Sequence, residues 1–142
     1  MAVPFLACMA LVASVYHLPP RALPAIQAVE GGAVGSVSRN ADGSDDLGVM
    51  QVNTLWLAPL ARVGRLPAAQ VRWRLIAEPC FNIAAAGLIL RLYLNETHGD
   101  LLAAVGDYHS HTPALNLDDR ARVLAAARNL FQRAGAGAAA PR

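Results

Sequence analysis

The stretch LPAIQAVEGG at residues 23–32 decides how this chain is interpreted, because it ends an apolar run in one acidic residue, Glu30. The chain has only three glutamates in 142 residues, and the other two are Glu78 and Glu96. An apolar environment raises the pKa of a carboxyl group, and a general acid needs a raised pKa near neutral pH. Glu30 is therefore a candidate general acid, and the alternative is that it only ends a helix.

A second informative stretch, NADGSDDLGVMQVN, occupies residues 40–53. Its first half is rich in turn-forming residues, and the Asp-Gly pair at 42–43 is a strong hairpin signal. Residues 31–39 contain too many glycines for a helix and have some strand character, and residues 49–52 are a candidate short strand. A small β region is therefore expected directly after the helix that ends near Glu30.

Most of the remaining chain has helical periodicity. Helices are predicted at about residues 5–17, 20–29, 53–63, 67–76, 80–95, from 101 onward and 116–133. The pattern predicts a mainly α, α+β fold in which a helical bundle carries a small irregular β region. We expect a single domain over residues 1–134 and a flexible Ala/Gly-rich tail over residues 135–142.

Composition and charge limit the function classes. Hydrophobic residues make up 55% of the chain and charged residues 15%, which favours a folded domain. The net charge is +2, and all twelve basic residues are arginines scattered along the sequence. This distribution lacks the basic cluster of a nucleic-acid-binding protein, so no nucleic-acid partner is expected. A mild positive charge is compatible with an anionic polymer but does not identify one.

The first sixteen residues are apolar, as in the core of a signal peptide, but they lack a basic start and are interrupted by Pro4. They are also too short to span a bilayer. We therefore expect a first core helix that carries Cys8, and no stable membrane span elsewhere in the chain.

The two cysteines, Cys8 and Cys80, leave two possibilities open. A disulfide between them would close a loop of about 73 residues, stabilise the fold by about 4 kcal/mol and imply an oxidising compartment. Alternatively, both are buried free thiols. Two cysteines alone do not make a metal site.

Five sequence elements in this order resemble the soluble lytic transglycosylase domain, particularly the small one-domain type associated with secretion and conjugation systems. The elements are Ala28–Gly32, Asn40–Asn53, Trp56, Pro79–Ala84 and Gly106–Ser110. Each element is a weak or moderate signal by itself, whereas the ordered set is strong. The resemblance covers roughly residues 5–133, which is nearly the whole chain.

This resemblance implies a lysozyme-like fold with a glycan cleft, and cleavage of the β-1,4 bond between N-acetylmuramic acid and N-acetylglucosamine in peptidoglycan. Glu30 matches the catalytic acid. Tyr108 matches the tyrosine of the third motif and is the second catalytic candidate, expected to bond Glu30 or to stabilise the developing positive charge. Gly48, Met50, Gln51 and Asn53 match the motif that lines the cleft. The cysteines resemble the disulfide pair of the small periplasmic members. The implied product carries a 1,6-anhydro ring, and no cofactor is implied.

The partners implied by the resemblance are peptidoglycan strands and a secretion, conjugation or pilus assembly. The implied location is periplasmic or exported, although this chain shows no clear signal sequence. Two rival functions stay open. One is a hydrolytic lysozyme that uses Glu30 with Asp45 or Asp46 as its second carboxylate. The other is a non-catalytic glycan-binding subunit of an assembly on the same fold.

Several site candidates also have structural explanations. The Met50 side chain can pack in the floor of the cleft. Gln51 and Asn53 can form hydrogen bonds with backbone groups of a turn. Tyr108 has the helical spacing of a core residue. Asp45 and Asp46 can hold the loop through backbone N–H groups. Trp56 and Trp73 are expected to be core anchors rather than sugar-stacking platforms.

The third motif departs from its usual form. It often reads Tyr-Asn-Ala-Gly in the related domains, whereas residues 108–111 here read Tyr-His-Ser-His. His109 and Ser110 are kept as substrate-binding candidates, and the role of His109 stays open. His109 and His111 lack a neighbouring cluster of cysteines or carboxylates, so no metal site is predicted.

Overall fold

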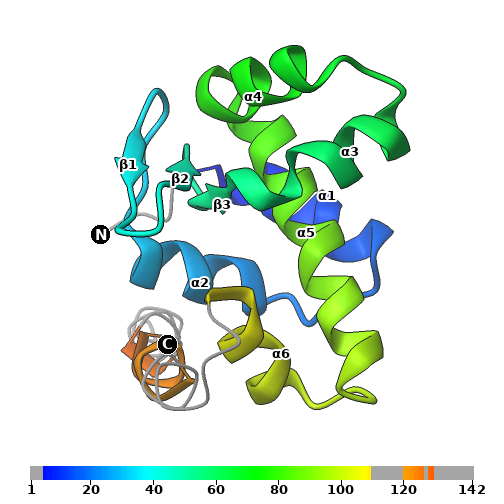
Figure 1. The fold of residues 1–142 in the computed structure, drawn as a ribbon. Helices are drawn as coiled ribbons and strands as arrows, with labels where there is room; N and C mark the ends of the chain where they lie inside the picture. The colour runs from blue at the N-terminus through cyan, green and yellow to red at the C-terminus, as the bar shows by residue number, and fades with distance from the viewer. Residues whose placement is uncertain (1–4, 110–119, 127, 130–142) are drawn as a thin grey trace, which may run out of the picture.

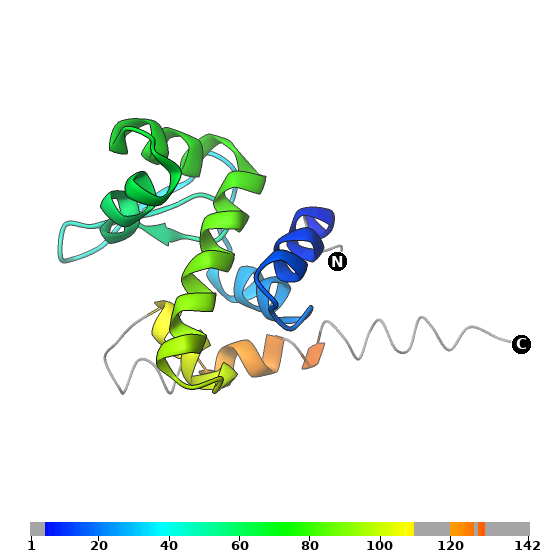
Figure 2. The same ribbon diagram turned by 90° about the vertical axis from the view of Figure 1, so that its right-hand side faces the viewer.

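A computed structural model describes residues 5–109, 120–126 and 128–129. The chain is mainly helical with a small antiparallel sheet, which confirms the predicted α+β class (Figure 1). Its longest helix, α5, runs diagonally through the middle of the bundle, as Figures 1 and 2 show from two sides. In chain order the α-helices are α1 (Leu6–Val15), α2 (Ala22–Glu30), α3 (Leu57–Gly64), α4 (Ala68–Ala77), α5 (Pro79–Glu96) and α6 (Leu101–His109).

Helix α5 can occupy the centre because its sequence is apolar on most sides. It begins with Pro79. Proline suits the first helical position, because an N–H at this position would have no acceptor within the helix. The helix contacts α1, α2, α4, α6 and β3. Its fully buried side chains include Ile83, Ile89 and Leu90, and burial of side chains of this size is the main source of the fold's stability.

The small sheet consists of β1 (Val37–Arg39), β2 (Asp45–Leu47) and β3 (Val52–Asn53), paired antiparallel in that order. The predicted hairpin is confirmed, with Val37 paired to Leu47 and Arg39 to Asp45. The strand predicted at residues 49–52 is only partly correct. Residues 49–51 form a turn because Gln51 has a positive φ of 52°, whereas β2 arises within the predicted loop.

The predicted helix at residues 53–63 consists of two parts. A 3-10 turn, η1 (Thr54–Trp56), precedes α3, and the side chain of Asn53 accepts a hydrogen bond from the backbone N–H of Leu55 at 2.9 Å. This is the side-chain capping expected of Asn at a helix start. In Figure 1 the sheet lies above α2, the helix that ends at Glu30, while α3 lies to the right of the sheet and α4 lies above α3.

The two tryptophans occupy different environments. Trp56 is partly buried against the core and meets the ring of Tyr93 edge-on, with ring centroids 5.9 Å apart. Trp73 is 61% exposed on α4, so its predicted role as a core anchor is wrong. Helical periodicity does not distinguish this position, because Val71 and Leu75 already supply the buried face of α4.

A disulfide joins Cys8 of α1 to Cys80 at the start of α5, across 72 positions of sequence. This settles the alternatives left open by the sequence in favour of the disulfide, and a disulfide is compatible with an exported protein. Within the described residues, no single helix is both long enough and apolar enough to cross a membrane; α4 and α5 pass such a test only as a pair bent by 111°.

Removal of this disulfide is expected to lower the free energy of unfolding by about 4 kcal/mol, because the unfolded chain regains the entropy that the cross-link removes. The measurement is urea unfolding of the Cys8→Ser/Cys80→Ser double variant beside wild type. Wild type in reductant should approach the variant, and the variant should not respond to reductant. Equal stability of wild type and variant would contradict the prediction.

Some expectations concern positions that the structure does not describe. The final predicted helix at residues 116–133 is helical over 120–126 and 128–129. Ser110, His111, the remainder of that helix and the tail at residues 135–142 lie outside the described residues.

Candidate active site

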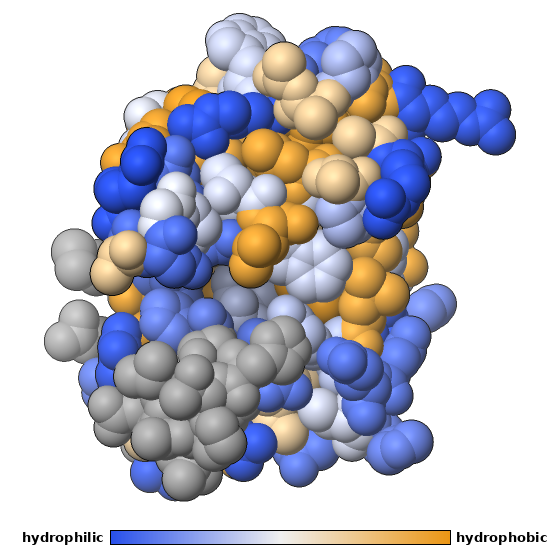
Figure 3. Space-filling view, viewed as in Figure 1, coloured by the Kyte–Doolittle hydropathy of each residue, from blue (hydrophilic) through white to orange (hydrophobic). Residues whose placement is uncertain are grey.

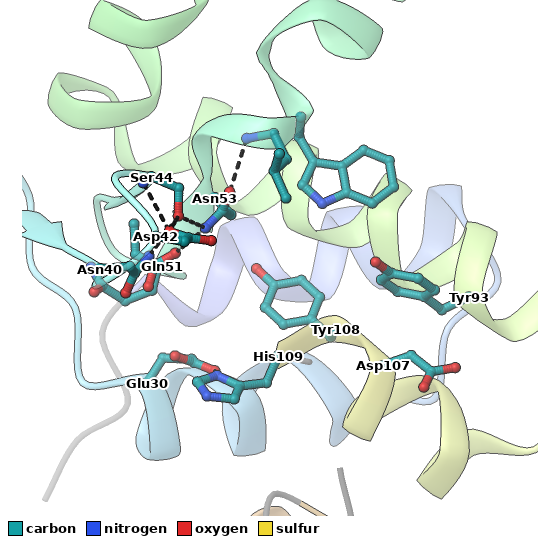
Figure 4. Close-up of a pocket in the computed structure, with 13 residues that line it drawn as sticks. Glu30, Asn40, Asp42, Ser44, Gln51, Asn53, Tyr93, Asp107, Tyr108 and His109 are labelled. Atoms are coloured by element: carbon teal, nitrogen blue, oxygen red, sulfur yellow. Dashed lines mark hydrogen bonds and ion pairs between the residues drawn. The ribbon is translucent and has the colours of Figure 1, made fainter. Parts of the chain in front are cut away.

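A polar cavity of about 420 Å³ lies between the end of α2 and the sheet. Figure 3 shows this face of the molecule hollowed across its middle, and Figure 4 shows the residues around the cavity. The lining residues come from the α2 end, the β region, η1, α5 and α6. They are Glu30, Asn40, Asp42, Ser44, Asp46, Gln51, Asn53, Leu55, Trp56, Tyr93, Asp107, Tyr108 and His109.

Glu30 is the last residue of α2 and projects into this cavity. Its side chain is 11% exposed, and the first part of the same helix, from Ala22 to Ile26, is buried. Its Oε1 lies 3.1 Å from Nδ1 of His109, the last residue of α6. Figure 4 shows the two side chains pointing toward each other. The largely buried side chain of Glu30 is thus held at one end of a polar cavity.

Gly32 explains the glycine pair that follows Glu30. A Cβ at this position would collide with the carbonyl oxygens of Gly48 and Val49 and with the side chain of Gln51. Only glycine therefore lets the segment after α2 approach the turn at residues 48–51. This close approach brings Glu30 next to the β region.

The turn at residues 48–51 is fixed from behind by Asn82 of α5, which is fully buried. Its Oδ1 accepts from the N–H of Met50 at 2.9 Å. Its Nδ2 donates to the carbonyl oxygens of Leu47 at 2.8 Å and Leu75 at 2.9 Å. One side chain therefore joins β2, the turn and the end of α4.

Gly48 and Met50 face this packing rather than the cavity. Gly48 has a φ of 68°, and a Cβ there would collide with the carbonyl oxygen of Leu75 and with Asn82. The side chain of Met50 is fully buried. Neither residue lines the cavity, so the structure places both beneath the site, where they shape the turn.

Gln51 and Asn53 do line the cavity, and both also make structural hydrogen bonds. Gln51 Nε2 donates to the carbonyl oxygen of Gly48 at 2.9 Å and to Ser36 Oγ at 3.2 Å. Asn53 Nδ2 donates to Ser44 Oγ and to Asp46 Oδ1, both at 3.0 Å. These bonds fix the two amides in one orientation at the cavity wall.

The hairpin turn contributes a further polar wall that sequence reasoning did not select. Ser44 Oγ donates to Asp42 Oδ1 at 2.6 Å and accepts from Asn40 Nδ2 at 3.1 Å. The hydrogen bonds from Ser44 lower the pKa of the Asp42 carboxyl group, so Asp42 is ionised at neutral pH. The turn-forming composition indicated this loop but not that its side chains face a cavity.

The two adjacent aspartates of β2 differ in their surroundings, because successive side chains of a strand point to opposite faces of the sheet. Asp45 is 7% exposed and is paired with Arg39 Nε at 2.6 Å and with Arg72 Nη2 at 3.1 Å. Asp46 lines the cavity and accepts from Asn53. Asp45 therefore fastens the hairpin to α4, and Asp46 is the aspartate available to a ligand.

Tyr108 docks α6 onto the turn. Its hydroxyl donates to the carbonyl oxygen of Met50 at 2.9 Å, whereas the Glu30 carboxyl group is held by His109. Burial raises the pKa of Tyr108 well above its ordinary value, and the charge of Glu30 raises it further. Tyr108 therefore remains a neutral hydrogen-bond donor.

The far end of the cavity is formed by Tyr93 and Asp107, which lie opposite Glu30 in Figure 4. Burial raises the pKa of Tyr93 to about 12, with smaller contributions from Glu96 and Asp107. Both residues were missed as site residues, because Tyr93 belongs to the apolar stripe of α5 and only the fold brings α5 and α6 to the cavity. Their positions lengthen the polar surface beyond Glu30.

The structure thus brings five of the predicted site residues together around one cavity. They are Glu30, Gln51, Asn53, Tyr108 and His109. Within the described part of the chain, no group of three or more His, Cys, Asp or Glu side chains is arranged to hold a metal ion.

Comparison with known proteins gives a partial similarity. Invasion protein IagB of Salmonella typhimurium strain SL1344 is 31% identical over 88 residues, which are 62% of this chain and 51% of that protein. Proteins of the same name from Salmonella typhimurium strain LT2 and Salmonella typhi match equally. The chain spans about half the length of the curated relatives it matches. No protein-family model matches the chain. The name refers to invasion and states no reaction, so this comparison alone assigns no activity.

Proposed function

We propose that the protein is a peptidoglycan lytic transglycosylase of the soluble lytic transglycosylase type. It would cleave the β-1,4 bond between N-acetylmuramic acid and N-acetylglucosamine and leave a 1,6-anhydro-N-acetylmuramic acid end. The observation that carries the proposal is the largely buried side chain of Glu30 at the end of a polar cavity that fixed amides of the β region also line.

The proposed reaction uses Glu30 twice. In its acid form Glu30 gives a proton to the glycosidic oxygen while the bond from that oxygen to C1 breaks. The C6 hydroxyl of the same sugar then attacks C1, and the Glu30 carboxylate takes the hydroxyl proton. The bond from C1 to O6 closes the anhydro ring, and Glu30 regains its proton. The attack is intramolecular, so correct positioning of the sugar supplies much of the acceleration.

The cavity wall suits the positioning of an acetamido sugar. Gln51 and Asn53 present amide groups whose orientation is fixed by hydrogen bonds to Gly48, Ser44 and Asp46. Fixed amides bind polar groups of a substrate with little loss of side-chain entropy. In this proposal they contact the N-acetyl groups. Tyr108 contributes indirectly by holding the turn at Met50.

A hydrolytic lysozyme is a second candidate, and the position of Asp46 favours it. Asp46 lines the same cavity as Glu30 and is the only one of the two predicted partner aspartates to do so. A retaining hydrolase needs a second carboxylate as its nucleophile, whereas the cyclising reaction uses the C6 hydroxyl. In the proposed transglycosylase, Asp46 would stabilise positive charge that develops at C1.

The Asp46→Asn variant separates the two candidates. We expect it to retain roughly a tenth to a hundredth of wild-type turnover, because only electrostatic stabilisation is lost. The asparagine Oδ1 can still accept from Asn53, so the fold should be unchanged. The measurement is muropeptide release per unit time. Loss as complete as that caused by removing Glu30 would favour the hydrolase.

A direct test of the proposed function compares two readouts on purified peptidoglycan. A cyclising enzyme clears the turbidity of a cell-wall suspension without producing new reducing ends, because C1 is closed in the anhydro ring. Hydrolysis produces one reducing end for every cut bond. Absence of clearing by folded, disulfide-intact protein would instead support a glycan-binding subunit.

The setting is also a proposal. The disulfide is compatible with export, and the partly similar relatives are named for invasion. We propose that the protein acts in the periplasm or after export, and that it opens the cell wall locally for a secretion, conjugation or pilus assembly. Isolation of the native protein from periplasmic extract, with its disulfide formed, is the expected result.

A further inference from the structure

The ring of His109 lies beside the proposed acid, although the sequence left its role open. Its Nδ1 is 3.1 Å from Glu30 Oε1, and the two residues are 79 positions apart in the chain. The side chain of His109 is 38% exposed, whereas that of Glu30 is 11% exposed. The contact therefore joins a solvent-accessible titratable group to a nearly buried one across the mouth of the cavity.

From this geometry we infer that His109 is a positioning residue that holds Glu30 Oε1 and leaves Oε2 as the oxygen that exchanges the proton with the sugar. The inference rests on the proposed function for its catalytic meaning. Within the described part of the chain, Oε2 has no protein hydrogen-bond partner. A carboxyl group with one oxygen anchored presents the other in a defined direction, which general acid catalysis requires.

The anchoring requires a particular tautomer. When the carboxyl proton is on Oε2, Oε1 can only accept, so Nδ1 must carry the imidazole proton and donate. The same Nδ1–H donates to Oε1 after the proton has moved to the sugar. One neutral tautomer of His109 therefore holds Glu30 through both halves of the reaction, and no rearrangement is needed between them.

Protonation of the imidazole changes this arrangement. An imidazolium beside the carboxylate stabilises its ionised form, which weakens it as the base of the ring-closing step. The other titratable groups around the cavity are Asp42, Asp46, Tyr93, Asp107 and Tyr108. Among the ordinary side chains, histidine alone changes charge between pH 5 and 8. His109 therefore makes turnover sensitive to mild acid.

The kinetic test compares wild type, His109→Ala and His109→Asn on purified peptidoglycan from pH 5 to pH 8. Loss of the anchor in His109→Ala should lower kcat by about 10- to 100-fold with little change in KM. Asparagine places an amide N–H where Nδ1 was, so His109→Asn should recover most of kcat at pH 7.5. Wild-type turnover should fall about tenfold between pH 7.5 and 5, and that of His109→Asn by less than about twofold.

The matched control is His98→Asn, the same change at an exposed position between α5 and α6 that does not line the cavity. It should keep the wild-type rate and pH profile. The inference is overturned if His109→Ala keeps the wild-type kcat. It is also overturned if the turnover of His109→Asn falls between pH 7.5 and 5 as much as that of wild type.

A second measurement does not depend on activity. Nitrogen-15 NMR, assigned with His109→Asn, reports the imidazole tautomer well above the ordinary imidazole pKa of ~6.5. Wild type should show the proton on Nδ1, and so should Glu30→Gln, whose side-chain oxygen still accepts. A wild-type proton on Nε2 overturns the inference, whereas an Nδ1 proton in an inactive wild type would support the pairing and reject the proposed function.

Discussion

The Glu30→Gln variant is expected to lose at least about 1,000-fold in muropeptide release, because one side chain supplies both the acid and the base of the proposed reaction. Glutamine has the same shape and can still accept from His109 Nδ1, so the cavity should be preserved. The melting temperature should remain within about 3 °C of wild type. The measurement is initial release from purified peptidoglycan at equal protein concentration.

Glu78→Gln is the matched control for this substitution. Glu78 precedes α5, is paired with Arg74 at 2.7 Å on the surface and does not line the cavity. A surface pair of this kind contributes at most about 1 kcal/mol, so Glu78→Gln should keep wild-type release. Near wild-type release by folded Glu30→Gln would show that another group supplies the proton.

The Asn82→Ala variant is expected to be less stable than wild type by about 3 kcal/mol or more. The substitution leaves the Met50 N–H and the carbonyl oxygens of Leu47 and Leu75 without their partner in a buried region, and each unsatisfied group costs about 1–3 kcal/mol. Urea unfolding measures the change. Because Met50 also accepts from Tyr108, weaker docking of α6 and lower muropeptide release are expected together with the loss of stability.

Asn95→Ala supplies the comparison on the same helix. Asn95 is exposed and accepts from Arg91 at 3.1 Å, so its substitution should change stability by less than about 0.5 kcal/mol. Similar losses for the two variants would mean that the buried bonds of Asn82 are replaced by other partners and do not hold the turn.

Local sequence signals were sufficient for the helical class, for the hairpin at residues 40–44 and for the position of Glu30. Each depends on neighbouring residues: the apolar run before Glu30, and the Asn, Asp and Gly residues of the turn. The strand at Asp45–Leu47 was not predicted, because its pairing with Val37–Arg39 and with the strand after the turn is a tertiary feature. Strand preference depends on such context more strongly than helix preference does.

The site itself shows the same limit. The resemblance placed Gly48 in the motif that lines the cleft, whereas in the structure Gly48 lets the backbone approach Leu75 and Asn82. The roles of Asn82 and His109 come from contacts to residues far away in the chain, which no local pattern records. The sequence motifs therefore identified residues near Glu30, whereas the contacts that each side chain makes depend on the packing of α5 and α6.

Mass spectrometry of the muropeptides released from purified peptidoglycan tests the proposed function most directly. Wild type should release products one water lighter than the corresponding hydrolytic products, and Glu30→Gln should release almost none. Such a result would support ring closure by the C6 hydroxyl with Glu30 as acid and base. Products that carry the added water would contradict the proposed transglycosylase and would favour hydrolysis with Asp46 as the second carboxylate.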